Sequence, residues 1–218
     1  MTALIFDFDG VIADSEALAN IVLAEEITAL GRPTSYEDAL DRYMGQRWHD
    51  LAALIAADVG ACLPKGFAKK LMVSTLERFR SELTEVSGAT AFIQRFASLP
   101  RCIASSSSEE RLEVCLEVLN LSHLFTDRVF SADLVPRGKP YPDIFLHAAR
   151  QLNVPPADCI VIEDSPSGVQ AGVAAGMTVI GLCAGSHIRQ GHAARLHAAG
   201  ASQIAQSWDE VATIVEQA

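Results

Sequence analysis

Two aspartates and a glycine follow a short apolar run near the start of the chain. The run that begins at Ala3 has no helical spacing and suits a strand that is buried on both faces. Side chains two residues apart on a strand project to the same side, so Asp7 and Asp9 should leave the strand end together. Gly10 lets the chain turn and bring its backbone close to a ligand. Because two neighbouring carboxylates repel unless a cation or a shared proton separates them, this pattern favours a Mg²⁺ site, with a solvated turn as the alternative interpretation.

The elements that would position this pair change in character along the chain. From residue 15 to about 83 the sequence reads as helix after helix, whereas beyond Gly88 short β-rich runs alternate with helical stretches. Such alternation is typical of a parallel sheet covered by helices on both faces. The β-rich runs, including the first strand, are residues 3–8, 102–104, 128–130, 159–162 and 178–181. We therefore predict an α/β fold, a doubly wound parallel sheet in a core domain of residues 1–14 and 84–218, with an α-helical cap domain of residues 15–83 inserted after the first strand.

Polar residues follow three further β-rich runs, at the position where ligands bind in sheets of this kind. Ser105 to Ser108 come after one run, Gly138-Lys139-Pro140 follow the loop after the next, and Glu163-Asp164-Ser165 follow a third. Taken singly, these segments are weak signals, since they can also be explained as a polar loop, a solvated lysine and an acidic helix start. Their shared position relative to successive strands predicts that they converge on one rim with Asp7 and Asp9.

Phosphoryl transfer is the reaction that this set of groups can perform. An aspartate such as Asp7 can attack a phosphoryl group and carry it as an acyl phosphate. Mg²⁺ held by Asp7, Asp164 and the backbone carbonyl of Asp9 would offset the developing charge. Ser105 and the backbone N–H groups beside it can hold phosphoryl oxygens, and Lys139 adds a fixed positive charge. Asp9 can protonate the leaving oxygen and later deprotonate the attacking water.

Composition excludes several other classes of function. The 218 residues carry a formal net charge of −10, which repels nucleic acid and anionic lipid. The five cysteines are dispersed and form no CxxC pair, and most of them sit in apolar surroundings, so we expect buried free thiols in a reducing compartment. No apolar stretch approaches the length needed to cross a bilayer. We predict a cytoplasmic protein that acts on a small phosphorylated metabolite, as a monomer or, alternatively, as a dimer.

Three histidines near the end of the chain recur at intervals of five residues. Neither a helix face nor a strand face would gather His187, His192 and His197. We interpret them as part of a surface segment rather than as a zinc site. The stretch that follows, residues 208–215, reads as a packing helix.

Four segments together resemble the four motifs of the haloacid dehalogenase-like (HAD) hydrolase superfamily. They are Asp7-Phe8-Asp9-Gly10-Val11, Ser105, Gly138-Lys139-Pro140-Tyr141-Pro142-Asp143-Ile144-Phe145 and Glu163-Asp164-Ser165-Pro166-Ser167-Gly168. The inserted helices are similar to the small α-helical cap of the subgroup that holds β-phosphoglucomutase, phosphoglycolate phosphatase and sugar-phosphate phosphatases. The resemblance implies Asp7 as nucleophile and Asp9 as acid and base. It also implies phosphate binding by Gly10, Ser105, Ser106 and Lys139, and a Mg²⁺ site of Asp7, Asp9, Glu163 and Asp164, with Glu163 either a ligand or a partner of Lys139.

Departures from the motifs of related enzymes separate the reactions of this superfamily. Asp9 disfavours dehalogenation, because displacing halide from carbon needs no protonated leaving group. No lysine stands within residues 15–30, which disfavours a phosphonatase that forms a Schiff base there. β-Phosphoglucomutases carry a histidine where Ala19 stands, an arginine where Trp48 stands, and a Lys-Asn pair in place of Ser108-Glu109.

We therefore predict a Mg²⁺-dependent phosphatase of small phosphorylated metabolites, with sugar or sugar-acid phosphates as substrates and an aspartyl-phosphate intermediate. The chain resembles bacterial sugar-phosphate phosphatases, the 6-phosphogluconate phosphatase type among them. A β-phosphoglucomutase-like mutase is the alternative, and a non-catalytic phospholigand-binding protein is a more distant one.

Substrate choice is expected to depend on the cap and on the core residues that face it. The predicted residues are Asn20, Gly45, Gln46, Arg47 and Trp48 of the cap, and Ser107 and Ser108 of the core. For Trp48 the alternative is packing within the cap, and for Arg47 it is a solvated charge.

Overall fold

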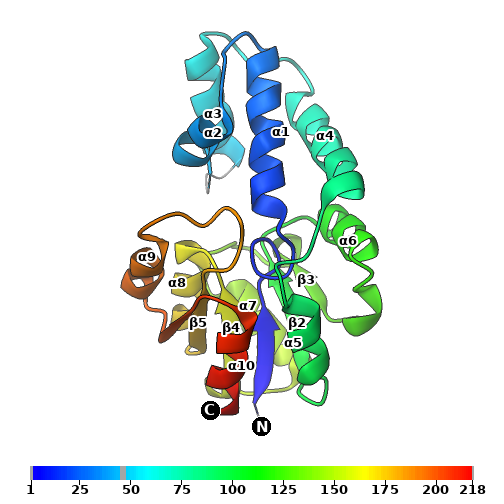
Figure 1. The fold of residues 1–218 in the computed structure, drawn as a ribbon, viewed down its shortest axis with the longest axis vertical. Helices are drawn as coiled ribbons and strands as arrows, with labels where there is room; N and C mark the ends of the chain where they lie inside the picture. The colour runs from blue at the N-terminus through cyan, green and yellow to red at the C-terminus, as the bar shows by residue number, and fades with distance from the viewer. Residues whose placement is uncertain (1, 45–47, 218) are drawn as a thin grey trace. The chain divides into compact units, whose positions relative to one another are not determined.

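The helices that follow the first strand form a unit of their own. The computed structural model describes residues 2–44 and 48–217. One unit, here called the core, comprises Met1–Asp14 and Thr84–Ala218, and the other, the helical insert, comprises Ser15–Leu83. The insert therefore interrupts the core directly after its first strand (Figure 1).

Within the described residues, the core contains a six-stranded parallel sheet in the order β3-β2-β1-β4-β5-β6. The strands are β1 (Ala3–Phe6), β2 (Arg101–Ser105), β3 (Val129–Ser131), β4 (Cys159–Glu163), β5 (Thr178–Leu182) and β6 (Gln203–Ala205). In the middle of the sheet, Phe6 of β1 stands opposite Ile103 on one side and Ile162 on the other. The direction of winding reverses between β1 and β4, and ligands bind beyond the carboxyl ends of the strands at such a switch point. The predicted doubly wound α/β fold with a helical insertion is confirmed.

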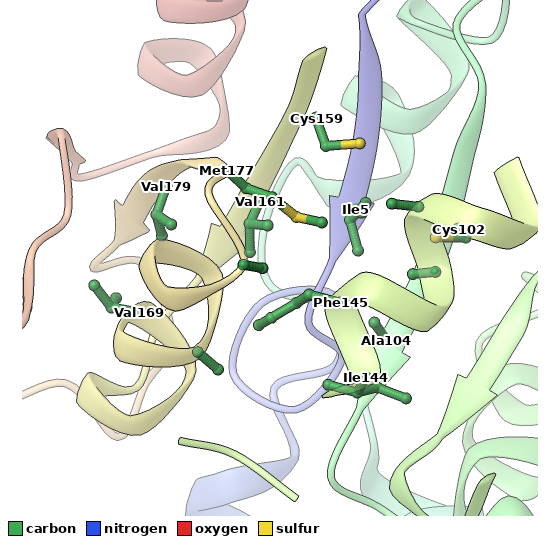
Figure 2. Close-up of a cluster of buried hydrophobic side chains, with 14 of the residues drawn as sticks. Ile5, Cys102, Ala104, Ile144, Phe145, Cys159, Val161, Val169, Met177 and Val179 are labelled. Atoms are coloured by element: carbon green, nitrogen blue, oxygen red, sulfur yellow. The ribbon is translucent and has the colours of Figure 1, made fainter. Parts of the chain in front are cut away.

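Alternate residues of β1 enter two separate hydrophobic clusters. The core helices are α5 (Ala89–Arg95), α6 (Glu109–Val118), α7 (Asp143–Leu152), α8 (Pro166–Ala174), α9 (His192–Ala199) and α10 (Trp208–Glu216), with short 3₁₀ turns η1 (Ser122–Leu124), η2 (Ala132–Leu134) and η3 (Pro156–Asp158). Ile5 is buried with Phe145 of α7 and Val161 of β4 (Figure 2). Phe6 packs instead against the rings of Phe92 in α5 and Trp208 in α10, with centroid distances of 6.1 Å and 5.9 Å. Burial on both faces explains why the run in β1 shows no alternation of polar and apolar residues.

The helical insert has its own small hydrophobic cluster. Its helices are α1 (Ser15–Ala29), α2 (Tyr36–Arg42), α3 (Trp48–Val59) and α4 (Phe67–Glu82). Ile27 of α1, Ile55 of α3 and Phe67 of α4 are buried together. Ser35 caps α2: its hydroxyl accepts a hydrogen bond from the Asp38 N–H at 3.1 Å, and the Asp38 carboxylate accepts one from the Ser35 N–H at 3.0 Å.

The two core segments that flank the insert are hydrogen-bonded to each other. The Asp14 N–H donates to the Thr84 carbonyl at 3.0 Å, and the Val86 N–H donates to the Ile12 carbonyl at 2.8 Å. An isolated antiparallel bridge joins Ala13 to Glu85. The outgoing and returning chains therefore leave the core as a short two-stranded ribbon.

Two elements of the core were not predicted, β6 and α9. β6 is three residues long and edges the sheet, so no period of two can be recognised in it. Leu196 is the one large apolar residue of α9, which therefore has no apolar stripe. α4 begins at Phe67, directly after Gly66, which takes a left-handed conformation at the N-cap.

Asp58, near the end of α3, is hydrogen-bonded to residues at the end of α2. We expect its replacement to make local unfolding of both helices more frequent. Its carboxylate accepts hydrogen bonds from the Arg42 guanidinium and from the Tyr43 hydroxyl, the latter at 2.6 Å. The hydrogen bonds from Arg42 lower the pKa of Asp58 to about 2, against an opposing effect of burial. Asp58→Asn should speed amide hydrogen exchange in these helices by about fivefold, since a hydrogen bond typically contributes about 1 kcal/mol.

The same pKa shift predicts the pH at which this contribution disappears. The folded-state pKa lies below the ordinary value of 3.8, so the stabilisation is present above about pH 4 and is lost as the pH falls towards about 2. Hydrogen exchange corrected for its intrinsic pH dependence measures this, with the exposed Asp41→Asn change as control. Equal acid sensitivity of wild type and Asp58→Asn would contradict the prediction.

The structure also bears on two predictions from composition. Among residues 2–44 and 48–217, no helix combines the length and apolar character that spanning a membrane requires. Cys102, Cys115, Cys159 and Cys183 are buried free thiols, as expected. Cys62 is exposed, because it lies in the loop between α3 and α4.

Candidate active site

The carboxyl ends of β1 and β4 bring three carboxylates together. Asp7 follows β1, Glu163 is the last residue of β4, and Asp164 comes next. One carboxylate oxygen of each lies within 4.8 Å of those of the other two, and all three residues are buried. The Asp7 N–H donates to the Ile162 carbonyl at 2.9 Å, so the sheet itself fixes where this side chain starts. Buried carboxylates at this spacing require positive charge beside them.

Lys139 provides positive charge from the loop before α7. Its Nζ donates to Asp7 Oδ1 at 2.5 Å and to Glu163 Oε1 at 2.7 Å. Only 4% of its side chain is exposed, and its Nζ lies 4.9 Å from the ring centroid of Phe145. The structure thus brings Lys139 together with Asp7 and Glu163 from three different segments of the chain.

Glu163 is held against Lys139 by the start of α8. Its second oxygen, Oε2, accepts hydrogen bonds from the N–H and the hydroxyl of Ser165, at 2.7 Å and 3.0 Å. The Ser165 hydroxyl in turn accepts from the Gly168 N–H at 3.1 Å and caps the helix. A Cβ atom at Gly168 would lie 1.6 Å from Glu163 Oε1, so the helix can approach this closely only with glycine there.

The charges of this cluster act on one another strongly. Burial raises the pKa of Asp7 well above its ordinary value; Lys139 opposes this, and the neighbouring Glu163 and Asp164 add to it. Burial alone would lower the pKa of Lys139, but the attraction of Asp7 and Glu163 outweighs it and the net shift is upward. The lysine therefore stays charged, while negative groups outnumber positive ones.

This donor set fits a divalent cation. The three side chains offer only oxygen, they are buried, and they carry more negative charge than Lys139 balances. Hard cations such as Mg²⁺ take oxygen ligands of this kind.

Gly10 brings the turn after β1 directly against Asp164. Its φ is +77°, and a Cβ atom there would lie 2.0 Å from Asp164 Oδ2 and 2.7 Å from His187 Cε1. Both the backbone conformation and the close approach therefore require glycine. The Gly10 N–H, a predicted phosphate donor, donates within the turn to the Ala13 carbonyl at 2.7 Å.

Asp9 has an environment unlike that of Asp7. Its Oδ1 accepts from Arg111 Nη2 and its Oδ2 from the Ser107 hydroxyl, both at 2.5 Å. The side chains of Asp9 and Arg111 are 12% and 16% exposed. Two carboxylates two residues apart thus have different partners, a common arrangement where one group reacts and the other moves protons.

The serine loop after β2 supports this pair of donors. Ser105 is buried, and its hydroxyl accepts from the Ser107 N–H at 3.0 Å. The Ser131 hydroxyl donates to the Ser107 carbonyl at 2.7 Å, which ties the loop to β3. Ser106 is exposed, and Ser108 caps α6 by accepting from the Arg111 N–H at 3.4 Å. Ser107, predicted as a specificity residue, is therefore a partner of Asp9.

The predicted cap residues are placed only in part. Asn20 is buried in α1, where its side-chain amide donates to the Glu16 carbonyl at 2.8 Å. Trp48 begins α3, is 45% exposed, and stacks on Phe67 with a centroid distance of 6.5 Å. Gly45, Gln46 and Arg47 lie outside the described residues.

Three polar residues at the site were missed or misread from the sequence. Arg111 gave one usable signal, since it stands in the first turn of a helix that follows a functional strand end. The interpretation of the histidines as a surface segment was wrong for His187 and His192, which are 3% and 5% exposed, and right for the exposed His197. The five-residue interval misled because α9 begins between them, after Gly191 with φ of +84°.

Comparison with known proteins places the chain in a family. A model of the haloacid dehalogenase-like hydrolases matches residues 1–176. The chain is 31% identical to 6-phosphogluconate phosphatase of Escherichia coli K12 over 186 residues, which are 85% of this chain and 84% of that protein. A haloacid dehalogenase-like protein of unknown function from Agrobacterium tumefaciens is 34% identical, with a TM-score of 0.89 over 100% of this chain and 98% of the other.

A further solved structure is of a hydrolase from Deinococcus radiodurans with bound phosphate and sodium. It is 32% identical, with a TM-score of 0.83 over 99% of this chain and 96% of the other. The family model and the E. coli relative each cover most of the chain, so the match is not confined to a single motif. The chain therefore belongs to the haloacid dehalogenase-like hydrolase family.

Proposed function

We propose that this hydrolase is a Mg²⁺-dependent phosphatase that releases inorganic phosphate from small phosphorylated sugars or sugar acids. The observation that carries the proposal is the contrast between two neighbouring carboxylates. Asp7 lies in a buried acidic cluster with Lys139, whereas Asp9 is held by Arg111 and Ser107. The relative that is a 6-phosphogluconate phosphatase and the relative that holds phosphate both support this reaction class.

The metal site in this proposal consists of the Asp7 and Asp164 carboxylates and the Asp9 backbone carbonyl. Glu163 contributes mainly by holding Lys139, because both of its oxygens already accept hydrogen bonds. When bound, Mg²⁺ supplies positive charge that offsets the charge of the phosphoryl oxygens and keeps Asp7 ionised.

In the first step, the Asp7 carboxylate attacks phosphorus and the bond from phosphorus to the sugar oxygen breaks. Asp9 gives its proton to that oxygen, so the sugar leaves as an alcohol and Asp7 carries an acyl phosphate. Lys139, Ser105 and the N–H groups around Ser106 stabilise the phosphoryl oxygens.

In the second step, the Asp9 carboxylate takes a proton from water. The water oxygen attacks phosphorus, the bond to Asp7 breaks, and inorganic phosphate leaves. Asp9 is then protonated again, ready for the next substrate. Substrate choice in this proposal depends on Asn20, on Trp48, on residues 45–47 and on Ser108.

Phosphate release from a panel of sugar phosphates and phosphorylated sugar acids, including 6-phosphogluconate, tests the proposal. Release should require Mg²⁺, stop with EDTA, and vanish in Asp7→Asn. Conversion of β-glucose 1-phosphate to glucose 6-phosphate with a bisphosphate primer, without net release, would replace the proposal with a mutase. No turnover in either assay would leave it without support.

Arg111 gives a more specific prediction for the same reaction. Arg111 Nη2 and the Ser107 hydroxyl hold the two oxygens of the Asp9 carboxylate, so in Arg111→Gln this side chain should lose part of its fixed orientation. We expect kcat for sugar phosphates to fall by about 10- to 100-fold, because proton transfer by Asp9 depends on the position of its carboxyl group. Arg150→Gln, an exposed change in α7, is the matched control. A kcat equal to that of wild type would show that Arg111 does not act through Asp9.

A further inference from the structure

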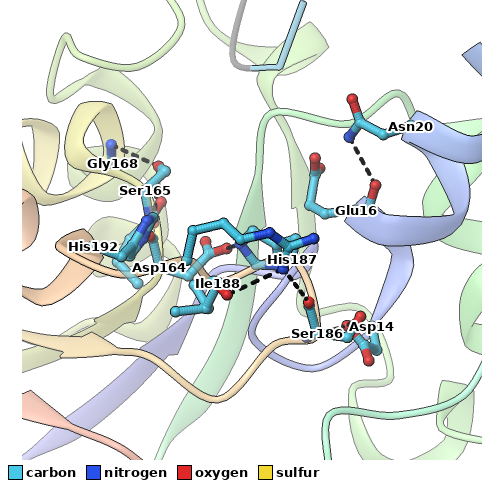
Figure 3. A network of polar contacts seen from close by, with 12 residues as sticks. Asp14, Glu16, Asn20, Asp164, Ser165, Gly168, Ser186, His187, Ile188 and His192 are labelled. Atoms are coloured by element: carbon cyan, nitrogen blue, oxygen red, sulfur yellow. Dashed lines mark hydrogen bonds and ion pairs between the residues drawn. The ribbon is translucent and has the colours of Figure 1, made fainter. Parts of the chain in front are cut away.

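Two histidines from one segment hold Asp164 at two different points. His187 Nε2 lies 3.0 Å from Asp164 Oδ2, and His192 Nε2 lies 2.5 Å from the Asp164 carbonyl oxygen (Figure 3). His187 belongs to the loop after β5, and His192 is the first residue of α9. Neither histidine has a part in the phosphatase steps above.

The tautomer of His192 follows from its partners. A carbonyl can only accept, so Nε2 carries the proton; Arg195 Nη2 can only donate, so Nδ1, at 2.8 Å, is the acceptor. Burial lowers the pKa of His192, although the hydrogen bond to Asp164 opposes this, and the neutral ring matches both contacts. His192 therefore fixes the backbone of Asp164 as a neutral donor.

The ring of His187 packs closely against the backbone of two glycines. A Cβ atom at Gly10 would lie 2.7 Å from its Cε1, and one at Gly185 would lie 2.8 Å from its Cε1 and Nδ1. The edge of the His187 ring also meets His192, with centroids 6.1 Å apart and planes at 89°. The ring is thus confined on several sides, and its Nε2 is aimed at one oxygen of Asp164.

The loop that carries His187 is anchored next to it. The N–H and the hydroxyl of Ser186 both donate to Asp14 Oδ1, each at 2.9 Å (Figure 3). Asp14 is itself fixed by the ribbon at the ends of the insert. The position of His187 is therefore set by the core backbone, independently of Asp164.

We propose that His187 is a positioning residue for the metal site: it holds the Asp164 carboxylate in the orientation that Mg²⁺ requires. A side chain with free rotation must lose that freedom when it ligates a cation, whereas one already held by a donor does not. The inference rests on the proposed Mg²⁺ site. It assigns the loop of residues 183–191 to metal binding, which no motif of the sequence indicated.

Direct titration of metal-free protein with Mg²⁺ in a calorimeter, without substrate, tests this. His187→Leu should weaken Mg²⁺ binding by about 10- to 100-fold, because it removes the donor and keeps an apolar side chain. His187→Gln, whose amide N–H can reach the place of Nε2, should restore binding to within about threefold of wild type. His197→Gln, in the same segment but exposed, should bind as wild type does. In turnover assays His187→Leu should raise the Mg²⁺ concentration for half-maximal rate by a similar factor and leave kcat at saturating Mg²⁺ within about twofold.

Gly185→Ala offers a route that removes no polar group from the protein. The added methyl would meet the His187 ring at 2.8 Å, so the ring must shift and Mg²⁺ binding should weaken. This variant decides the question if His187→Leu does not fold.

Three results would overturn the inference. The first is binding by His187→Leu or Gly185→Ala as tight as by wild type. The second is equal weakening in His187→Leu and His187→Gln, which would show that the ring acts by packing alone. The third is a wild type that binds no Mg²⁺, which would remove the proposed metal site and this inference with it. The first two results leave the phosphatase proposal intact. Failure of the inference about His187 can therefore be distinguished from failure of the proposed function.

Discussion

Asp7→Asn is expected to lower kcat by on the order of 10⁴-fold or more, the scale seen when a nucleophile is removed from an enzyme. An amide of the same size does not attack phosphorus, so no acyl phosphate can form. Mass spectrometry of acid-quenched reactions should find a phosphoryl group on the Asp7 peptide of the wild type and none in the variant. Residual turnover within about tenfold of wild type would exclude Asp7 as the nucleophile.

The same substitution should leave the metal-free protein at least as stable as wild type. The pKa of Asp7 is raised in the folded state, chiefly by burial, so the ionised side chain opposes folding once the pH rises above the ordinary value of 3.8. Replacing it by a neutral group removes that opposition while Glu163 still pairs with Lys139. Thermal unfolding in EDTA at neutral pH measures this, with the exposed Asp133→Asn as control. A clear loss of stability would mean that the ion pair with Lys139 outweighs the cost of burial.

Asp9→Asn is expected to slow hydrolysis of sugar phosphates by about 10²- to 10⁴-fold, the usual contribution of general acid–base catalysis. The loss should depend on the leaving group. A sugar alkoxide needs a proton as it departs, whereas p-nitrophenolate does not. With p-nitrophenyl phosphate the first step should therefore stay fast, and the acyl phosphate should accumulate because no base activates water.

Rapid mixing separates these two steps. Asp9→Asn should show a burst of p-nitrophenol equal to the enzyme concentration, followed by slow turnover, and Asp7→Asn should show no burst. Ser107→Ala, which removes one partner of Asp9 and keeps its carboxylate, is the matched comparison and should retain steady turnover. An equal loss of the first step for both classes of leaving group would contradict the assignment of Asp9.

Residues that follow strands were the ones that the sequence could predict. Asp7, Glu163 and Asp164 stand at the ends of buried apolar runs, and parallel strands bring such ends to one edge of the sheet. Lys139 was predicted because it lies in the loop that follows another strand of the same sheet. The structure places its Nζ between Asp7 and Glu163. These residues lie close together because of the backbone topology of the parallel sheet. The alternation of strands and helices in the sequence predicts that topology.

Residues whose position depends on tertiary packing were missed. Arg111 reaches Asp9 only because α6 starts where the serine loop ends, and the sequence shows there an ordinary polar helix start. His187 reaches Asp164 through a loop whose path is set by Ser186 and by close contacts to two glycines. Such contacts carry no period and no spacing, and only the place of Arg111 in the first turn of a helix after a functional strand end gave a signal.

The ribbon that joins the two ends of the insert has a consequence for how enzymes of this kind diversify. Ile12 is hydrogen-bonded to Val86, and Asp14 to Thr84. The distance between the two points where an inserted segment leaves and re-enters the core is therefore fixed by the core alone. The insert can be lengthened, shortened or exchanged during evolution without displacement of Asp7 or Asp9. Changes in the insert can then alter substrate recognition while the catalytic residues of the core keep their positions.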